Sequence, residues 1–183
     1  MRDIRQLTVL PCGDDVLRLR RIGAHDEADL FDIYGDPDVM RHASDPVFRD
    51  SGQVRQTILS IARNIHTGTA LELGVVLKST EQLIGVCGFH NFGPDTAEIG
   101  YLLNRDHWGR GLMRRALTLL IRTYAAPLAL SSLTADVDRA NRRSAGTLMA
   151  LGFALLREEG DDRIYHLDLG SWTSAGPRPL VDV

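Results

Sequence analysis

Two glycines and a group of arginines stand at the start of a strongly patterned helix. The stretch NRDHWGRGLMRRAL, residues 104–117, places Gly109 and Gly111 just before the first helical turns and adds Arg110, Arg114 and Arg115. A helix N-terminus presents unpaired N–H groups and a positive dipole end, and glycine lets that backbone approach an anion. A bound polyanion would also offset the arginine charge, so the stretch indicates a phosphate site. Glycines that only shape a turn and arginines that only face solvent would give the same pattern.

Two familiar phosphate motifs do not account for this stretch. GxxxxGK[ST] is absent. The pattern GxGxxG is incomplete, because Arg114 stands where the third glycine is needed. The preceding strand also belongs to a meander and does not open a dinucleotide-binding fold.

Glu98 is the residue that best fits a general base. It shares a strand face with Gly100, which has no side chain and leaves space beside it. A carboxylate partly buried among apolar neighbours would have a raised pKa, closer to that of a working base. The alternative interpretation is a solvated or salt-bridged strand residue, and His90 and His107 are the alternative bases.

A second helix start carries the pattern N-x-x-S, with Asn141 and Ser144. Asparagine is a good N-cap and serine suits a first turn, so capping alone would explain both residues. Ser144 could also hydrogen-bond a leaving thiol or act as its acid. A thiol has a pKa of roughly 8.5, so its anion leaves without much help.

Hydrophobic periodicity predicts the elements that hold these residues. Helical stripes occupy 25–35, 51–68, 110–124 and 141–153, and strand patterns occupy 16–23, 69–78, 82–90, 96–104, 131–138, 154–159 and 163–169. Residues 36–50, with two Asp-Pro steps, are predicted to be a loop. This order predicts a mixed α+β sheet with helices on both faces, an antiparallel meander of three strands, and parallel pairing of 96–104 with 131–138.

The runs AEIGYLLNRDHWGRGLMRRAL (97–117) and ADVDRANRRSAGTLMALGF (135–153) resemble the GNAT superfamily of acyl-CoA-dependent N-acetyltransferases. More narrowly, the chain resembles the ribosomal-protein N-terminal alanine acetyltransferases, with which VLRLRRIGAHDEADLF, LIGVCGFHNF and the order of elements agree. The resemblance covers about residues 14–169. It implies a GNAT-type, mostly antiparallel sheet of about seven strands, splayed between 96–104 and 131–138.

The resemblance also implies which residues contact the coenzyme. In that family the turn before the helix binds the pyrophosphate of coenzyme A in the pattern Gln/Arg-x-x-Gly-x-Gly/Ala. The matching run here is WGRGLM (108–113), with a tryptophan typical of this branch at the first position and a bulkier methionine at the last. The coenzyme contacts carried over are Leu102, Leu103, Trp108, Gly109, Arg110, Gly111, Leu112, Met113, Arg114, Asn141 and Arg143.

The activity implied is transfer of an acetyl group from acetyl-CoA, a co-substrate, directly to a primary amine, without a metal. Glu98 would remove the amine proton, the backbone N–H of Leu103, or else Leu102, would polarise the carbonyl, and Ser144 would assist the leaving thiol. The tyrosine acid usual in the family is missing from 141–153. Its absence, with Met113, leaves open a coenzyme-binding sensor or interaction module without catalysis.

The acceptor amine is not specified by these residues. The branch suggests a protein N-terminal amine, whereas related enzymes modify polyamines, antibiotics and small amino compounds, and a fold does not settle a substrate.

Composition narrows the class further. With 183 residues, 44% hydrophobic and 25% charged, the composition predicts one globular domain. The resemblance implies an N-acetyltransferase domain at 14–169, which leaves a loose leader at 1–13 and a loose tail at 170–183. The net charge of −3 argues against nucleic acid. The two cysteines have no metal or redox spacing, which favours a reducing compartment. The sequence also shows no signal-peptide region and no membrane-spanning run. Together these features predict a cytoplasmic protein with no membrane partner. Trp172 in the tail suggests a contact in a homodimer.

Overall fold

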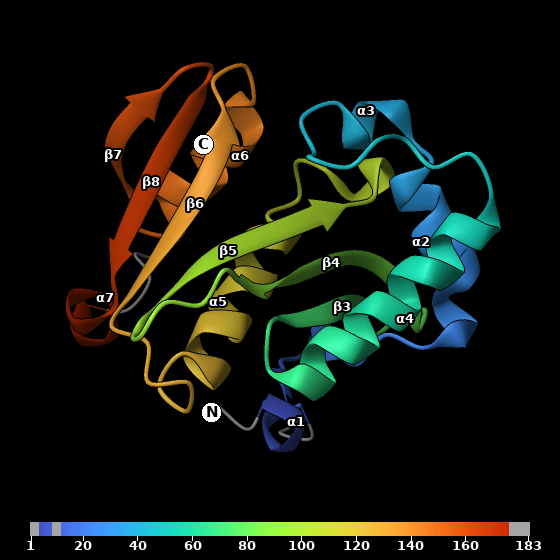
Figure 1. The fold of residues 1–183 in the computed structure, drawn as a ribbon, viewed down its shortest axis with the longest axis horizontal. Coiled ribbons are helices and arrows are strands. Elements are labelled where there is room, and N and C mark those ends of the chain that lie inside the picture. The colour runs from blue at the N-terminus through green and yellow to red at the C-terminus, as the bar shows by residue number, and fades with distance from the viewer. Residues whose placement is uncertain (1–3, 9–11, 176–183) are drawn as a thin grey trace.

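A twisted eight-stranded sheet organises the residues that the computed structural model describes, 4–8 and 12–175. The strand order is β1-β2-β3-β4-β5-β6-β8-β7 (Figure 1). The strands are β1 (Cys12–Gly13), β2 (Leu17–Arg20), β3 (Leu71–Leu77), β4 (Gln82–His90), β5 (Thr96–Leu103), β6 (Ser132–Asp138), β7 (Ala154–Glu159) and β8 (Asp162–Asp168). This arrangement confirms the predicted mixed α+β class.

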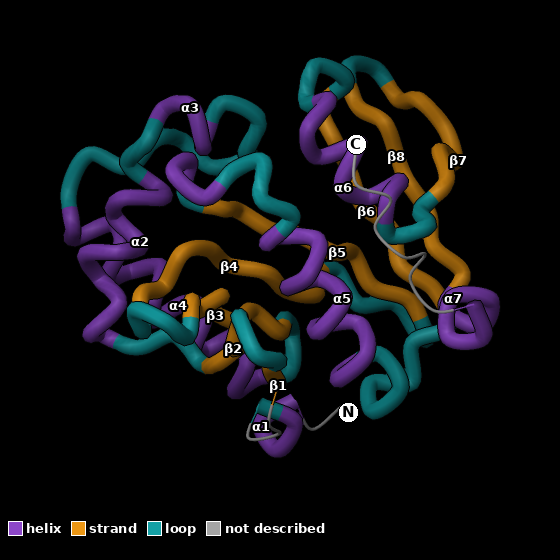
Figure 2. Tube along the Cα trace, turned by 180° about the vertical axis from the view of Figure 1, so that it is seen from behind, coloured by secondary structure: helices purple, strands orange, loops and turns teal. Residues whose placement is uncertain are grey.

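Helices cover both faces of this sheet. The α-helices are α1 (Ile4–Leu7), α2 (Glu27–Tyr34), α3 (Pro37–Met40), α4 (Ser51–Thr67), α5 (Leu112–Tyr124), α6 (Arg142–Ala150) and α7 (Leu169–Ala175). Helices α2 and α4 lie on one face, and α5 and α6 lie on the other, as the front view and the view from behind together show (Figures 1 and 2).

Helix α4 illustrates how the sequence sets these boundaries. The Asp50 side chain accepts a hydrogen bond from the Gln53 N–H at 3.2 Å, which caps the first turn. Gly68 ends the helix with φ of 75°, a left-handed conformation that favours glycine. The apolar stripe Val54, Ile58, Ile61 and Ile65 is buried, as the helical spacing predicts.

The meander of β3, β4 and β5 is antiparallel, and β5 pairs with β6 in parallel, both as predicted. The parallel pairing joins only Thr96–Glu98 to Ser132–Thr134. Beyond these pairs the two strands diverge and leave a fork, which is visible in Figure 1. The predicted splay is therefore confirmed, and it opens the sheet where the candidate residues of β5 lie.

The structure corrects the interpretation of residues 36–50 as a plain loop. The run Pro37–Met40 forms α3, and Asp36 caps it by accepting from the Asp38 N–H at 2.8 Å. An Asp-Pro step can open a helix, because aspartate is a good N-cap and proline suits the first helical position. The first Asp-Pro step, Asp36-Pro37, therefore marks a helix start, whereas the second, Asp45-Pro46, lies in a loop.

The ends of the chain are also more ordered than predicted. Residues 169–175 form α7, and Trp172 is buried and donates its indole N–H to the Leu151 carbonyl at 3.0 Å. Trp172 is therefore part of this chain's own core, and its burial there removes the basis for treating it as a dimer contact. Near the other end, Ile4 on α1 is buried in the main core. Residues 1–3, 9–11 and 176–183 of the predicted leader and tail lie outside the described residues.

Candidate functional site

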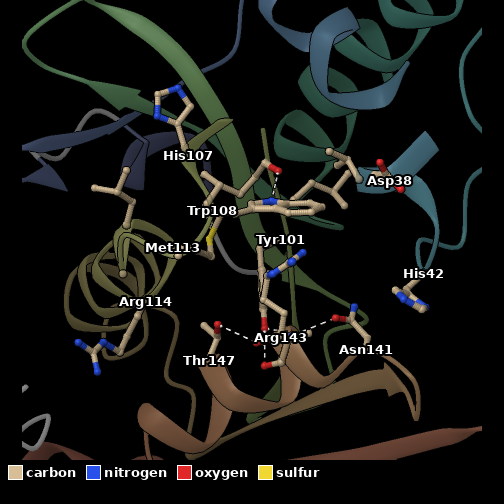
Figure 3. Close-up of a pocket in the computed structure, with 17 residues that line it drawn as sticks. Asp38, His42, Tyr101, His107, Trp108, Met113, Arg114, Asn141, Arg143 and Thr147 are labelled. Atoms are coloured by element: carbon tan, nitrogen blue, oxygen red, sulfur yellow. Dashed lines mark hydrogen bonds between the residues drawn. The ribbon is translucent and has the colours of Figure 1, made fainter. Parts of the chain in front are cut away.

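A cavity of about 260 Å³ lies where the fork meets the start of α5. We call it the α5 cavity. Among the predicted coenzyme contacts, Arg110 does not line it, and the others do: Leu102, Leu103, Trp108, Gly109, Gly111, Leu112, Met113, Arg114, Asn141 and Arg143. Figure 3 shows how residues from β5, α5 and α6 converge around this space. The structure thus brings together residues that are up to 41 positions apart in the sequence.

The glycine turn has the geometry of an anion cradle. Gly109 and Gly111 have φ of 75° and 67°, and a Cβ built at Gly109 would meet nothing within 4 Å. Gly111 is the N-cap of α5 and supplies no side-chain hydrogen bond to the first turn. The first-turn N–H groups therefore lack a side-chain cap and face an open space, which suits a phosphate group.

The arginines of this helix start do not all serve the turn. Arg115 forms ion pairs with Asp14 and Asp15 and ties α5 to the chain before β2. Arg114 lines the α5 cavity. On the other side of the turn, His107 lines the cavity, and its Nδ1 is buried without a hydrogen-bond partner among the described residues. This nitrogen is therefore a buried polar atom whose hydrogen-bonding capacity is not met by the described residues.

Trp108 joins the end of β5 to the start of α6. Its indole N–H donates to the Leu103 carbonyl at 2.8 Å, and the Arg143 guanidinium carbon lies 3.7 Å from the centroid of the ring. A guanidinium over an aromatic face is a cation–π contact. Figure 3 shows this stacked pair in the centre of the cavity.

The backbone of Leu103 points into the fork. The Asn104 N–H donates to the Ile84 carbonyl of β4, and antiparallel pairing alternates the direction of successive residues. The N–H and carbonyl of Leu103 therefore point away from β4, in agreement with its bond to Trp108. Leu102 points the opposite way, toward β4. Of the two predicted donors, Leu103 is the one directed at the open edge.

A tyrosine stands beside Ser144, although none occurs in 141–153. The Tyr101 hydroxyl, from β5, lies 2.7 Å from the Ser144 hydroxyl. Burial raises the pKa of Tyr101 to about 12, so this phenol keeps its proton at neutral pH. Asn141 accepts from the Ser144 N–H at 3.1 Å, which confirms its expected role as N-cap of α6. Sequence reasoning missed Tyr101 because the search was confined to one helix.

A second cavity of about 550 Å³ lies on the face of the sheet that α2 and α4 cover. We call it the sheet cavity. It meets the α5 cavity at six residues that line both: Val39, His42, Tyr101, Leu102, Asn141 and Ser144. The His42 Nδ1 lies 2.7 Å from an Asp138 carboxylate oxygen, so this hydrogen bond connects the segment after α3 to β6 at the junction. The Tyr101–Ser144 pair is therefore accessible from both cavities.

The predicted base Glu98 lines the sheet cavity together with His90. The Asn91 amide donates to the Glu98 carboxylate at 2.8 Å. The space predicted beside Gly100 is occupied, because a Cβ there would lie 3.3 Å from the His90 ring. Burial lowers the pKa of His90, although the charge of Glu98 opposes this shift. His107, the other alternative base, lies in the α5 cavity.

Glu72 is a second residue that sequence reasoning missed. It stands in β3 between buried leucines, its side chain lines the sheet cavity, and burial raises its pKa to about 7. The Tyr34 hydroxyl, at 3.4 Å, is its hydrogen-bond partner among the described residues. A glutamate within an otherwise apolar strand was the available signal, since one face of that strand had to be covered by helices.

Two further observations concern metal and membrane. In residues 4–8 and 12–175, no group of three or more His, Cys, Asp or Glu side chains is arranged to hold a metal ion. Within the same residues, no helix has the length and apolar character needed to cross a bilayer.

Two cavities therefore meet at one hydroxyl pair, and one of them is built on a helix start without a side-chain cap. The acetyltransferase (GNAT) domain family matches residues 17–154, and the chain belongs to this family. Membership of this family makes the chain an acetyltransferase by class.

Individual relatives agree with this assignment. The uncharacterized N-acetyltransferase p20 of Bacillus licheniformis is 33% identical over 147 residues, which are 78% of this chain and 83% of that protein. The ribosomal protein uS5-alanine N-acetyltransferase of Escherichia coli is 30% identical over 121 residues, 64% of this chain and 61% of that protein. The fold is shared with the microcin C7 self-immunity acetyltransferase MccE, solved with acetyl-CoA and AMP (TM-score 0.77, 20% identity, 88% of this chain and 99% of that one).

Proposed function

We propose that this protein transfers the acetyl group of acetyl-CoA to a primary amine by direct attack within the fork. The observation that carries the proposal is the meeting of the α5 cavity and the sheet cavity at Tyr101 and Ser144. A coenzyme held on the glycine turn and an amine entering over the sheet would meet there. Acetyl-CoA supplies an activated acyl group, so the reaction needs only proton movements and charge stabilisation from the chain.

The coenzyme is assigned to the α5 cavity. The first-turn N–H groups after Gly111 receive the pyrophosphate, and Gly109 leaves room for its approach. Arg114 and Arg143 supply positive charge in the same cavity. Met113 does not disturb this role, because its side chain is buried in the core while its backbone stays in the first turn.

Three groups perform the transfer. Glu98 receives a proton from the attacking amine, and the backbone N–H of Leu103 donates to the carbonyl oxygen as charge develops on it. The new N–C bond forms while the C–S bond breaks. Tyr101, hydrogen-bonded to Ser144, gives a proton to the departing sulfur, which replaces the acid that the sequence alone assigned to Ser144.

The sensor interpretation loses much of its support at this point. It depended on a missing tyrosine and on Met113, and Tyr101 places a protonated phenol beside Ser144 from a different element. Catalysis therefore remains the function that the site favours.

The acceptor is proposed from two kinds of support. The relative named for ribosomal protein uS5 supports a protein N-terminal amine, the expectation drawn from the sequence. A small amine is the second candidate, and the carboxylates of the sheet cavity favour it.

A thiol-release assay with acetyl-CoA and a panel of amines tests the enzyme, and a parallel titration measures acetyl-CoA binding. The base is tested by Glu98→Gln and His90→Gln, with Glu81→Gln, in the turn before β4, as the control. We expect Glu98→Gln to lower kcat/KM at neutral pH and to leave acetyl-CoA affinity nearly intact. An unchanged rate in Glu98→Gln with a loss in His90→Gln would transfer the role to His90. Binding without turnover of any amine would restore the sensor.

A further inference from the structure

Five carboxylates line the sheet cavity, and its possible cations among the described residues are the side chains of His42 and His90. Its carboxylates are Asp45, Glu72, Glu98, Asp136 and Asp138, and no lysine or arginine is among the described residues that line it. Of these, Asp138 is paired with His42, and Glu98 accepts from the uncharged Asn91 amide. A single reacting amine at Glu98 leaves the remaining negative charge without a counterpart. The cavity therefore fits an acceptor with more than one positive charge.

We infer that the acceptor is a small oligoamine, whose second ammonium group is held by Glu72 and Asp45 while its reacting amine lies beside Glu98 and Tyr101. This inference rests on the proposed function and names the class of its acceptor. It concerns the end of the sheet cavity beneath α2 and α4, which the transfer chemistry itself does not use.

The register of the sheet provides a path between the two ends. Glu72 is directly opposite Gly88 on β4, and Gly88 is directly opposite Gly100 on β5. Side chains of directly opposed residues lie on the same face, so Glu72 and Gly100 face the same cavity, which both of them line, and Gly88 between them carries no side chain. Two strand spacings separate Glu72 from Gly100, which is roughly 10 Å. A chain of methylenes with an amine at each end spans this distance.

Glu72 has the properties of an anion that lacks its cation. Its hydrogen bond from Tyr34, at 3.4 Å, is long, and a carboxylate can accept several donors. Burial raises its pKa, and the nearby charge of Asp45 raises it further, while the Tyr34 bond opposes both. An ammonium group between Glu72 and Asp45 would relieve this repulsion and supply charge-assisted hydrogen bonds.

The size and position of the cavity favour a small molecule over a peptide. Its volume of about 550 Å³ is within the range typical of small-molecule sites. The Glu72 end lies between the sheet and α4, whose residues Thr57, Ser60 and Asn64 line it. A peptide acceptor that leaves through the fork would place its second charge elsewhere.

The test compares two amines that differ in charge and hardly in length, spermidine and octylamine, and adds a peptide acceptor. Spermidine, octylamine and an alanine-starting hexapeptide are assayed by thiol release with the native protein, with Glu72→Gln and with Glu81→Gln. We expect kcat/KM for spermidine to exceed that for octylamine at least tenfold, and Glu72→Gln to reduce this ratio about tenfold, through KM. Glu81, which is exposed and pairs with Arg18, should leave the ratio within twofold.

Several outcomes would overturn the inference. A native protein that does not prefer spermidine to octylamine, or that prefers the hexapeptide, excludes an oligoamine acceptor. A Glu72→Gln variant that lowers kcat equally for both amines makes Glu72 a base and not an anchor. If Glu72→Gln does not fold, judged by its melting and its acetyl-CoA binding, Asp45→Asn makes the same test. Failure of the proposed function is distinct, since no amine would then release thiol.

Discussion

The Tyr101 hydroxyl gives the sharpest test of the transfer step. Tyr101→Phe removes one oxygen and leaves the ring, so the packing against β4 and α6 is kept. The hydroxyl lies 2.7 Å from Ser144, and burial raises its pKa to about 12, which keeps the proton available. A hydrogen bond to a group that becomes charged contributes about 1.5–3 kcal/mol. At about 1.4 kcal/mol for each factor of ten, we expect kcat to fall roughly 10- to 100-fold.

This loss is at the low end for general acid catalysis, because a thiolate with a pKa of roughly 8.5 is already a good leaving group. Ser144→Ala should cost less than Tyr101→Phe, since the phenol remains. The double variant should be no slower than Tyr101→Phe, because the two hydroxyls act as a unit. Initial rates of thiol release at saturating acetyl-CoA measure all three, and Tyr124→Phe, which removes a buried hydroxyl in α5, is the control.

The pH dependence adds a second check. With its pKa near 12, Tyr101 should cause no loss of kcat between pH 6 and about 10, so no alkaline decline in that interval belongs to it. A Tyr101→Phe enzyme with kcat within twofold of the native value would refute the assignment of the acid, and Ser144 would then have to be reconsidered.

Three further substitutions test other parts of the structure. Gly111→Ala, at φ of 67°, should weaken acetyl-CoA binding about tenfold by titration, whereas Gly146→Ala inside α6 should bind normally and melt no lower. Asp26→Asn breaks the buried pair with Arg20 and should cost about 3–5 kcal/mol of unfolding free energy at pH 7 by urea titration. Burial alone would raise the pKa of Asp26, but Arg20 and the Gly23 N–H hold this pKa below its usual value. The stability that the ionised Asp26 carboxylate contributes to the fold is therefore complete above about pH 4, and it is lost as the pH falls through the pKa of Asp26 in the folded state. Trp172→Ala should cost about 3–5 kcal/mol, and a melting temperature equal to that of the native protein would contradict its place in the core.

Local patterns predicted most of the fold because the elements carry their own signals. The stripe of α4 with its Asp50 cap, and the nearly all-apolar β4, are where the periodicity placed them. The fork was also predicted, since it follows from the resemblance and from the crossover through α5. The helices α3 and α7 were not predicted, because they are too short for a periodic apolar stripe to mark them.

The site was predicted in part for a related reason. The glycine turn is contiguous, so residues 108–114 could be found together, and ten of the eleven predicted coenzyme contacts line the α5 cavity. Tyr101 and Ser144 are 43 positions apart and meet only because β5 and α6 face each other across the fork. Glu72 could be recognised only once its strand face was known to carry a cavity. Pairings of this kind depend on tertiary structure, which no local pattern encodes.

The fork also bears on how this enzyme can change during evolution. The N–H and carbonyl of Leu103, like the first-turn N–H groups after Gly111, belong to the main chain, which is chemically the same whatever side chains are attached. The proposed acceptor side is different, because the groups that Glu72, Asp45 and Glu98 present to the sheet cavity belong to their side chains. Mutation can therefore redesign the acceptor cavity one residue at a time while the main-chain cradle for the coenzyme persists. A lineage built on this fork keeps its acyl donor and is free to exchange its acceptor.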